Sequence, residues 1–445
     1  MMLKKTDSNT QLIKNTQSAA TSIYEKGSGK LTQLNVQGWN LLAEEVSFPI
    51  AVLNEKLLQG NAQWMQSFTD QSAVKLAPHG KTTMAPELFK LQLEQGCWGI
   101  SLATVPQVVN AYHSGITRII LANQLIGAYH FELIANLLMQ GNLTLYCFVD
   151  SIENVHSLGE YFTERNIPLK ILLEVGVDGG RCGWRDVNNI TPLIEVIKQY
   201  DCLHLSGLSF YEGVIYGDNA VDKVSTFVDE IINLTRKLQS DNVFHSCDVV
   251  VTGAGSAWYD VVAKQLMSAS DCGLNFTAVI RPGCYLIHDT GIYQQAQDTV
   301  IERSQLACDI SGELVSSLEL WAYVHSIPEP GLAIIGLGKR DVAFDAGLPT
   351  PQSHFRPKLN HVSVHHENPN NRQQFAEPQP VDKSWQVVDI MDQHCMMKIP
   401  QGADLLVGDL VAFSSSHPCL TIDKWRQLAI VDEKYIVKKT IATYF

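Results

Sequence analysis

The chain has 445 residues, and 33 Lys+Arg against 46 Asp+Glu leave a formal net charge of −13. Apolar residues make up 45% of the chain and charged residues 18%. This balance excludes a disordered protein, because disordered chains lack the apolar surface that offsets the entropy of ordering. A net acidic surface repels phosphate, which argues against a nucleic-acid-binding protein. The length favours about two or three domains.

The N-terminal segment and the cysteines indicate a cytoplasmic protein. Residues 1–30 are rich in Ser, Thr, Gln and Lys and lack the apolar core of a secretory signal, so we interpret them as a mobile arm, or a weakly anchored first helix, without a chemical role. Residues 31–73 lead into the first domain or join the second. Ten cysteines, scattered singly, do not form a disulfide framework. No apolar run reaches the roughly 18 residues of a membrane span, so we expect no membrane partner.

Residues 74–300 alternate short apolar runs with longer amphipathic segments, which predicts repeated strand–helix units. Most of the runs are mainly apolar and do not alternate with polar residues, as expected for parallel strands that are covered on both faces. Eight such units favour a (β/α)₈ barrel, although a doubly wound open sheet is the alternative, since periodicity does not show closure. The predicted strands are Val74–Ala77, Trp98–Ala103, Arg118–Ala122, Leu143–Val149, Leu169–Val175, His204–Phe210, Asp248–Thr252 and Phe276–Ile280.

Residues 301–445 show a different pattern, which predicts an antiparallel β domain. Alternating runs are separated by turns that contain Gly or Pro, without long helical patterns between them. Segment Pro349–Pro380 is polar, and we expect it to be a long loop. The predicted strands are Leu318–Val324, Leu332–Ile335, Trp385–Ile390 and Leu405–Phe413.

Polar and Gly-rich segments follow the predicted barrel strands, where the chemistry of such barrels is found. Lys81 follows the first strand and could form a Schiff base if its neighbours lower its pKa; an ordinary surface lysine is the alternative. Thr252-Gly-Ala-Gly-Ser256 follows the seventh strand, and its backbone N–H groups could approach an anion. A lysine on one loop and an anion cradle on another indicate pyridoxal phosphate (PLP).

His417 and Cys419 lie two residues apart in the predicted β domain. In an extended segment their side chains would face the same side, and an imidazole with a thiolate is a plausible pair of zinc ligands. A packed cysteine beside a surface histidine is the alternative. The sequence therefore offers a candidate metal site in the second domain.

Taken together, these segments resemble the fold-type III PLP enzymes, which share an alanine racemase-like N-terminal barrel. The resemblance spans about Leu76 to Phe445 and is greatest to the D-serine dehydratase and D-threonine aldolase family, including bacterial amino acid deaminases. The matching stretches are Pro78–Pro86, Asp178–Gly183, Thr252–Ser256, Arg281–Tyr285 and Ser416–Trp425.

The resemblance implies roles for individual residues. Lys81 would bind PLP covalently, and His417 with Cys419 would bind Zn²⁺, with Mn²⁺ as the alternative metal. The cofactor would be held by Arg181, Tyr211, Tyr216, Thr252, Gly253, Gly255, Ser256, Gly283, Cys284 and Tyr285.

The resemblance also implies a lyase that acts on a β-hydroxy-D-amino acid. Lys81 would remove the Cα proton, and the metal would act on the β-hydroxyl group, giving a 2-oxo acid and ammonia. Cys419 favours this dehydratase over an aldolase, because aldolases of the family tend to have Asp at that position. Cleavage to glycine and an aldehyde, and a non-catalytic PLP-binding protein, are the alternatives. Related enzymes imply a homodimer in which Asp341 and Asp345 reach the neighbouring site.

Overall fold

The first part of the fold is an eight-stranded parallel sheet that curls into a barrel. The structure, a computed structural model, describes residues 25–29, 38–357 and 375–445. The strand order is β2-β9-β8-β7-β6-β5-β4-β3. The strands are β2 Lys75–Leu76, β3 Ile100–Leu102, β4 Arg118–Gln124, β5 Thr144–Val149, β6 Leu169–Val175, β7 Leu203–Phe210, β8 Val250–Gly253 and β9 Thr277–Ile280. The eight strands are those predicted, and no end differs by more than two residues.

Closure of the barrel decides against a doubly wound open sheet. The first and last strands of the sheet, β2 and β3, are joined by a parallel bridge between His79 and Ser101. The Trp98 N–H also donates to the Leu76 carbonyl, at 2.7 Å. The bridge lies directly before Lys81, so the closure of the barrel also holds the lysine-bearing segment.

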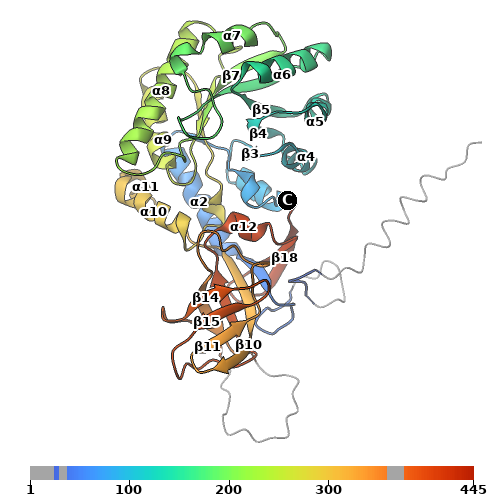
Figure 1. The fold of residues 1–445 in the computed structure, drawn as a ribbon, viewed down its shortest axis with the longest axis vertical. Helices are drawn as coiled ribbons and strands as arrows, with labels where there is room; N and C mark the ends of the chain where they lie inside the picture. The colour runs from blue at the N-terminus through green and yellow to red at the C-terminus, as the bar shows by residue number, and fades with distance from the viewer. Residues whose placement is uncertain (1–24, 30–37, 358–374) are drawn as a thin grey trace, which may run out of the picture.

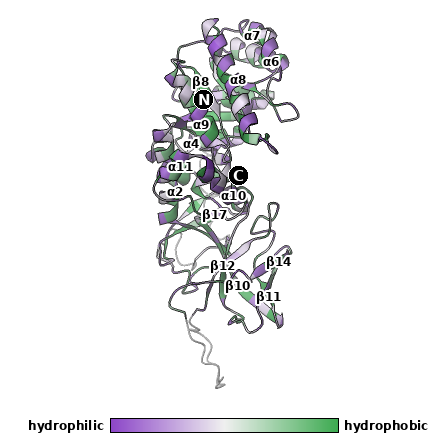
Figure 2. Ribbon diagram, turned by 90° about the vertical axis from the view of Figure 1, so that its left-hand side faces the viewer, coloured by the Kyte–Doolittle hydropathy of each residue, from purple (hydrophilic) through white to green (hydrophobic). Residues whose placement is uncertain are grey.

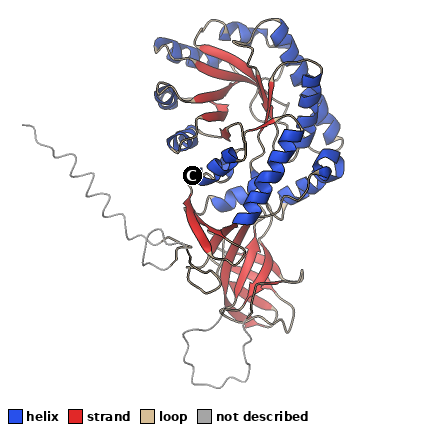
Figure 3. Ribbon diagram, turned by 180° about the vertical axis from the view of Figure 1, so that it is seen from behind, coloured by secondary structure: helices blue, strands red, loops and turns tan. Residues whose placement is uncertain are grey.

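Amphipathic helices surround the barrel strands (Figures 1 and 3). In Figure 2 these helices carry both purple and green along their length, as expected for helices with one apolar face on the sheet. None of the helices in the described ranges has both the length and the apolar character of a membrane span. The helices are α2 Glu55–Gln71, α3 Pro86–Glu94, α4 Val105–His113, α5 Ala128–Leu138, α6 Ile152–Glu164, α7 Thr191–Ile197, α8 Ala220–Ser240, α9 Tyr259–Asp271, α10 Ile292–Arg303 and α11 Gln305–Asp309.

The second part is a mostly antiparallel sheet with the strand order β13-β12-β16-β10-β1-β17-β18; β11 also pairs with β10 and β15, and β14 with β15. It packs below the barrel in Figure 1, and the C-terminus lies at the junction of the two parts. The elements are β1 Ile50–Asn54, β10 Leu318–Glu329, β11 Leu332–Ile335, β12 Thr350–Phe355, β13 Gln379–Pro380, β14 Gln386–Ile390, β15 Cys395–Lys398, β16 Leu410–Ser414, α12 Pro418–Ile422, β17 Gln427–Val431 and β18 Val437–Ala442.

Three features of the second part differ from the prediction or refine it. β1, from the N-terminal segment, pairs with both β10 and β17, so the chain contributes to the β sheet before it enters the barrel. Residue 300 lies inside α10, and the change from helices to strands follows α11 instead. The expected loop Pro349–Pro380 was wrong at both ends, because β12 pairs along the whole length of β16 and β13 pairs with β12; residues 358–374 of the loop lie outside the described residues. Most of the expected N-terminal arm lies outside the described residues.

Candidate functional site

A cavity of about 600 Å³ lies between the carboxyl ends of the barrel strands and the segment that contains α12. Its lining comes from both parts of the fold, although the sequence segments involved are more than 300 residues apart. The predicted residues that line it are Lys81, Arg181, Tyr211, Gly255, Ser256, Gly283, Cys284, His417 and Cys419. The structure thus brings the lysine and the two candidate metal ligands to one cavity.

Lys81 is presented to the cavity by a short 3₁₀ turn, Gly80–Thr82, that follows β2. His79, two residues earlier, points its Nδ1 at the Ser101 carbonyl oxygen at 3.0 Å. Burial, together with the positive charge of Lys81, lowers the pKa of His79 to about 3. His79 is therefore neutral near neutral pH and adds no charge beside the lysine amine.

The Gly-rich loop after β8 is held by a buried glutamate. Glu212 is 0% exposed, and its carboxylate accepts the N–H groups of Ala254 at 3.0 Å and Gly255 at 2.7 Å. Burial raises the pKa of the Glu212 carboxyl group. The Gly255 N–H, expected to bind the phosphate, is thus bonded to Glu212, whereas Ser256 faces the cavity.

Thr252 and Gly253 do not line the cavity, and they contact residues that surround it instead. The Thr252 hydroxyl accepts a hydrogen bond from Arg281 Nη1 at 2.7 Å. A Cβ atom on Gly253 would meet the Phe210 ring at 2.3 Å, so glycine is required there by packing. Both residues were predicted to contact the cofactor, but they are the last two residues of β8 and do not belong to the loop that follows it.

Two tyrosines predicted at the cofactor are also placed elsewhere. Tyr285 is buried, and its hydroxyl accepts a hydrogen bond from Gln92 Nε2 at 3.0 Å. Tyr216 is 82% exposed and does not reach the cavity, because the loop that follows β7 carries it into solvent. Tyr211, from the same loop, does line the cavity.

Two guanidinium groups give the cavity its positive charge. Arg181 lies over the Tyr211 ring, with its Cζ 4.3 Å from the ring centroid. Arg281 donates to the Phe210 carbonyl oxygen at 2.9 Å. Burial lowers the pKa of Arg281 to about 10, so it remains charged near neutral pH. Arg281 begins one of the sequence stretches that match the family and directly follows β9, but sequence analysis predicted no role for it at the site.

His417 lines the cavity from the position directly before α12, and Cys419 lines it from the first turn of that helix. The His417 Nδ1 lies 2.7 Å from Asp345 Oδ2, and the Cys419 Sγ lies 3.3 Å from the Cys284 Sγ. A hydrogen bond with Cys419, assisted by Asp345, raises the pKa of His417 to about 9. Hydrogen bonds with Cys284 and then His417 lower the pKa of Cys419 to about 5. Cys419 is therefore a thiolate near neutral pH, which is the form that binds metals.

The aspartates that were expected to reach a neighbouring subunit are engaged within their own chain. Asp345 is the partner of His417 described above, and it orients the imidazole through Nδ1. Asp341 is buried and accepts a hydrogen bond from Lys26 Nζ at 2.9 Å. Its backbone carbonyl also accepts from the Trp425 indole at 2.8 Å. Asp341 is thus part of the support of this segment and not of the cavity lining.

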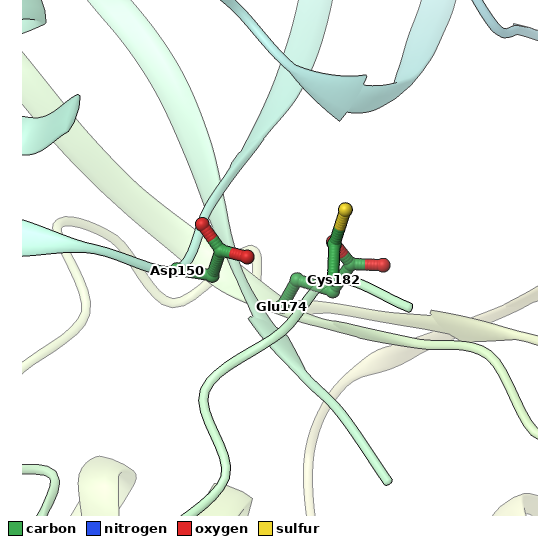
Figure 4. A group of neighbouring side chains, drawn as sticks. All are labelled: Asp150, Glu174 and Cys182. Atoms are coloured by element: carbon green, nitrogen blue, oxygen red, sulfur yellow. The ribbon is translucent and has the colours of Figure 1, made fainter. Parts of the chain in front are cut away.

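A cluster of two carboxylates and a thiol, which the sequence did not indicate, contains Asp150, Glu174 and Cys182 (Figure 4); of these, Glu174 and Cys182 line the cavity. The ligand atoms of Asp150, Glu174 and Cys182 all lie within 4.8 Å of one another. Asp150 accepts the Gly183 N–H at 2.7 Å, and Glu174 accepts the Gln124 amide at 2.5 Å. Burial raises the pKa of Glu174. Asp150 thus supports the loop that carries Arg181, whereas Glu174 joins β6 to the end of β4.

Comparisons with known proteins agree with this geometry. Residues 53–261 match the family described as "Alanine racemase, N-terminal domain", and residues 317–431 match "Putative serine dehydratase domain". D-threonine aldolase of Arthrobacter sp. is 23% identical over 330 residues, which cover 73% of this chain and 79% of the relative. D-threo-3-hydroxyaspartate dehydratase of Delftia sp. (strain HT23) is 27% identical over 135 residues, which cover 30% of this chain and 35% of the relative.

A solved structure extends the likeness to the whole fold. The crystal structure of D-threonine aldolase from Filomicrobium marinum superposes with a TM-score of 0.71 at 19% identity, covering 92% of this chain and 98% of that structure. Its fold and the two matched domains together imply PLP as the cofactor. The chain therefore belongs to the fold-type III family of PLP-dependent enzymes, and it is a lyase of the group that contains the D-threonine aldolases and serine dehydratases.

Proposed function

We propose that the protein eliminates water from a β-hydroxy-D-amino acid, of the size of D-serine or D-threonine, and that one water is taken up again when the dehydrated product hydrolyses to a 2-oxo acid and ammonia. The observation that supports this proposal is the shared cavity: Lys81 comes from the barrel, and His417 and Cys419 come from the β domain. An amine and a metal-binding pair that face one space can act on neighbouring carbons of one small substrate.

The cavity fits PLP by the chemistry of its lining. Lys81 would bind the aldehyde carbon, Ser256 would bind the phosphate, and Arg181 would lie beside the ring. A Cβ atom on Gly283 would meet the His79 carbonyl oxygen at 2.6 Å, so only glycine brings its backbone this close to the lysine-bearing turn. PLP, when bound, withdraws electrons from the substrate Cα and makes its proton acidic.

His417 and Cys419 fit a metal ion with one nitrogen and one sulfur ligand. Because Asp345 occupies Nδ1, the imidazole would use Nε2. A carboxylate on the other ring nitrogen is the usual support of a metal-binding histidine, since it orients the ring and increases its basicity. We assign the site to Zn²⁺, which prefers imidazole and thiolate, with Mn²⁺ as the alternative. The ion would supply a Lewis acid for the β-hydroxyl group.

The chain's own residues would move the protons. The Lys81 amine, once displaced by the substrate, would take the proton from Cα as a general base. Because the pKa of His79 is low, this imidazole is neutral near neutral pH and would add no positive charge beside the Lys81 amine. Arg181 and Arg281 offer positive charge to the anionic groups of cofactor and substrate. The hydroxyl group would then leave on the side of His417 and Cys419.

Retro-aldol cleavage is the second candidate, because the Arthrobacter relative is a D-threonine aldolase. It would use the same residues, but the β-hydroxyl would lose its proton and the Cα–Cβ bond would break. The cysteine at position 419 favours dehydration, by the resemblance described above. The homodimer and the cytoplasmic location remain predictions from the sequence.

A product assay tests the proposal and separates the two reactions. The purified protein, loaded with PLP, is incubated with D-serine or D-threonine, with a chelator and then with added Zn²⁺. Pyruvate or 2-oxobutyrate with ammonia would support the dehydratase, whereas glycine with an aldehyde would support the aldolase. Cys419→Ala should lose the Zn²⁺ response, and Cys308→Ala, which removes an exposed thiol on α11, is the matched control.

A further inference from the structure

Cys284 and Cys419 form a sulfur–sulfur contact at the cavity. Their Sγ atoms lie 3.3 Å apart, although the residues are 135 positions apart in the chain. Thr82 lies beside both, with its Oγ1 3.7 Å from the Cys284 Sγ and 3.4 Å from the Cys419 Sγ. Both cysteines line the cavity, so small molecules that enter it can reach this pair.

Packing of the flanking segments holds the two sulfurs together. Downstream of Cys284, the Thr290 hydroxyl shares a hydrogen bond with the Ser414 hydroxyl. A Cβ atom on Gly291 would meet the Ser416 Cα at 3.0 Å, so the two backbones lie in contact at this point. The sulfur–sulfur contact thus follows from how the barrel and the β domain are joined.

The other cysteines do not share this arrangement. All ten lie in the described parts of the chain, and among them no other two sulfurs are in contact. Cys97, Cys147 and Cys395 are buried in separate places, and burial raises the pKa of each of these thiols to about 12. Among the ten cysteines, only Cys284 and Cys419 are therefore expected to be oxidised together as a pair.

We propose that Cys284 and Cys419 are a peroxide-sensitive thiol pair that closes to a disulfide and thereby removes a metal ligand from the cavity. The loss of the metal rests on the proposed function, whereas the formation of the disulfide does not. The sulfurs need to approach by roughly 1.2 Å to reach the S–S bond length of about 2.05 Å. Rotation of two side chains that border an open cavity can supply that movement.

The chemistry balances with a peroxide as the oxidant. The Cys419 sulfur, the less buried of the two, attacks one oxygen of hydrogen peroxide; the O–O bond breaks, and the leaving oxygen takes up a proton as water. The Cys284 sulfur then attacks the sulfenic sulfur of Cys419. The S–S bond forms, the S–O bond breaks, and a second water leaves with the Cys284 proton. Two thiols lose two electrons, and one peroxide becomes two waters.

The test treats the PLP-loaded, zinc-loaded enzyme with a few equivalents of hydrogen peroxide after the reductant has been removed. Peptide mass spectrometry without reduction should find a cross-link between the peptides that contain positions 284 and 419, with the loss of two hydrogens. Zinc bound per chain should fall in proportion to the cross-link, and both changes should reverse when dithiothreitol and Zn²⁺ are added.

Two variants complete the test. Cys284→Ser should leave Cys419 without a resolving thiol, so that peroxide produces a dimedone-reactive sulfenic acid and no cross-link. Cys308→Ser should behave as the wild type. If the wild-type enzyme keeps the thiols of Cys284 and Cys419 free while its exposed cysteines oxidise, the proposal of a peroxide-sensitive pair is wrong. A cross-linked enzyme that retains its zinc would overturn the loss of the ligand, and a reduced enzyme that never binds zinc would instead count against the proposed function.

Discussion

Glu212→Gln tests how the Gly-rich loop is prepared for the cofactor phosphate. In the wild type, one buried carboxylate accepts the N–H groups of Ala254 and Gly255, at 3.0 and 2.7 Å. The amide of Gln can accept only one of them through its oxygen, and its NH₂ group then faces the other N–H. The variant therefore loses one hydrogen bond to a charged group while leaving the size of the side chain unchanged.

The expected magnitude follows from that single bond. A hydrogen bond to a charged group contributes about 1.5–3 kcal/mol. If this free energy must be recovered when PLP orders the loop, the dissociation constant of PLP rises about 10- to 150-fold, since every 1.4 kcal/mol is tenfold. Titration of the apo protein with PLP, followed by absorbance, measures this constant. Glu160→Gln, at an exposed position on α6, is the matched control and should bind PLP as the wild type does.

The pH dependence gives a second readout of the same bond. Burial raises the pKa of Glu212, so acidification protonates it at a higher pH than an exposed glutamate. Protonation turns an acceptor oxygen into a donor, and the affinity of the wild type for PLP should fall towards that of the variant. An affinity within twofold of the wild type would refute the reasoning. Tighter binding by Glu212→Gln would show that repulsion between the carboxylate and the phosphate outweighs the hydrogen bond.

Three other substitutions test the remaining parts of the molecule. Lys81→Ala should remove the near-visible absorption band of the bound cofactor and lower turnover by at least about 100-fold, because the general base is lost. Cys419→Ala should keep that band but lose bound zinc and turnover; a full zinc content would contradict the assignment. Asp409→Asn should destabilise the β domain by about 1.5–3 kcal/mol in urea unfolding, since it removes the charged acceptor that Arg356 contacts at 3.0 Å and His354 at 2.8 Å, while Arg356 keeps Asp404 as its second partner at 2.8 Å. Although burial opposes it, hydrogen bonds from His354 and Arg356 hold the pKa of Asp409 below its usual value; its contribution to stability is therefore present above about pH 4 and lost as the pH falls, so the deficit of the variant should shrink in acid.

The strands of the barrel could be predicted because their sequence carries the signal of their environment. A strand covered on both faces is mainly apolar, and Leu169–Val175 was predicted with the bounds it has in the structure. The strand β12, Thr350–Phe355, carries no such signal. Its residues are mostly polar, and it is a strand because β16 offers it a complete row of backbone partners. Composition does not report a pairing that is imposed by a neighbour.

The residue types of the site were also visible in the sequence, because Lys81, Ser256, His417 and Cys419 lie in segments whose order along the chain is typical of the family. Their supports were not visible. Glu212 was not expected to hold the Gly-rich loop, and Tyr216, which was expected at the cofactor, is exposed and does not line the cavity. Which residue of a loop turns inward depends on the conformation of the whole loop, and periodicity does not describe loops.

The sequence by itself determined the two kinds of domain, the repeated strand–helix units and the chemical groups available for catalysis, since each depends on local pattern and composition. Only the tertiary structure decided which of those groups meet. Asp345 contacts His417 across 72 positions, and Cys284 contacts Cys419 across 135. The first contact joins two segments of the β domain, and the second arises where the barrel and the β domain pack together. Such contacts depend on how distant segments fold against one another, which no short stretch of sequence contains.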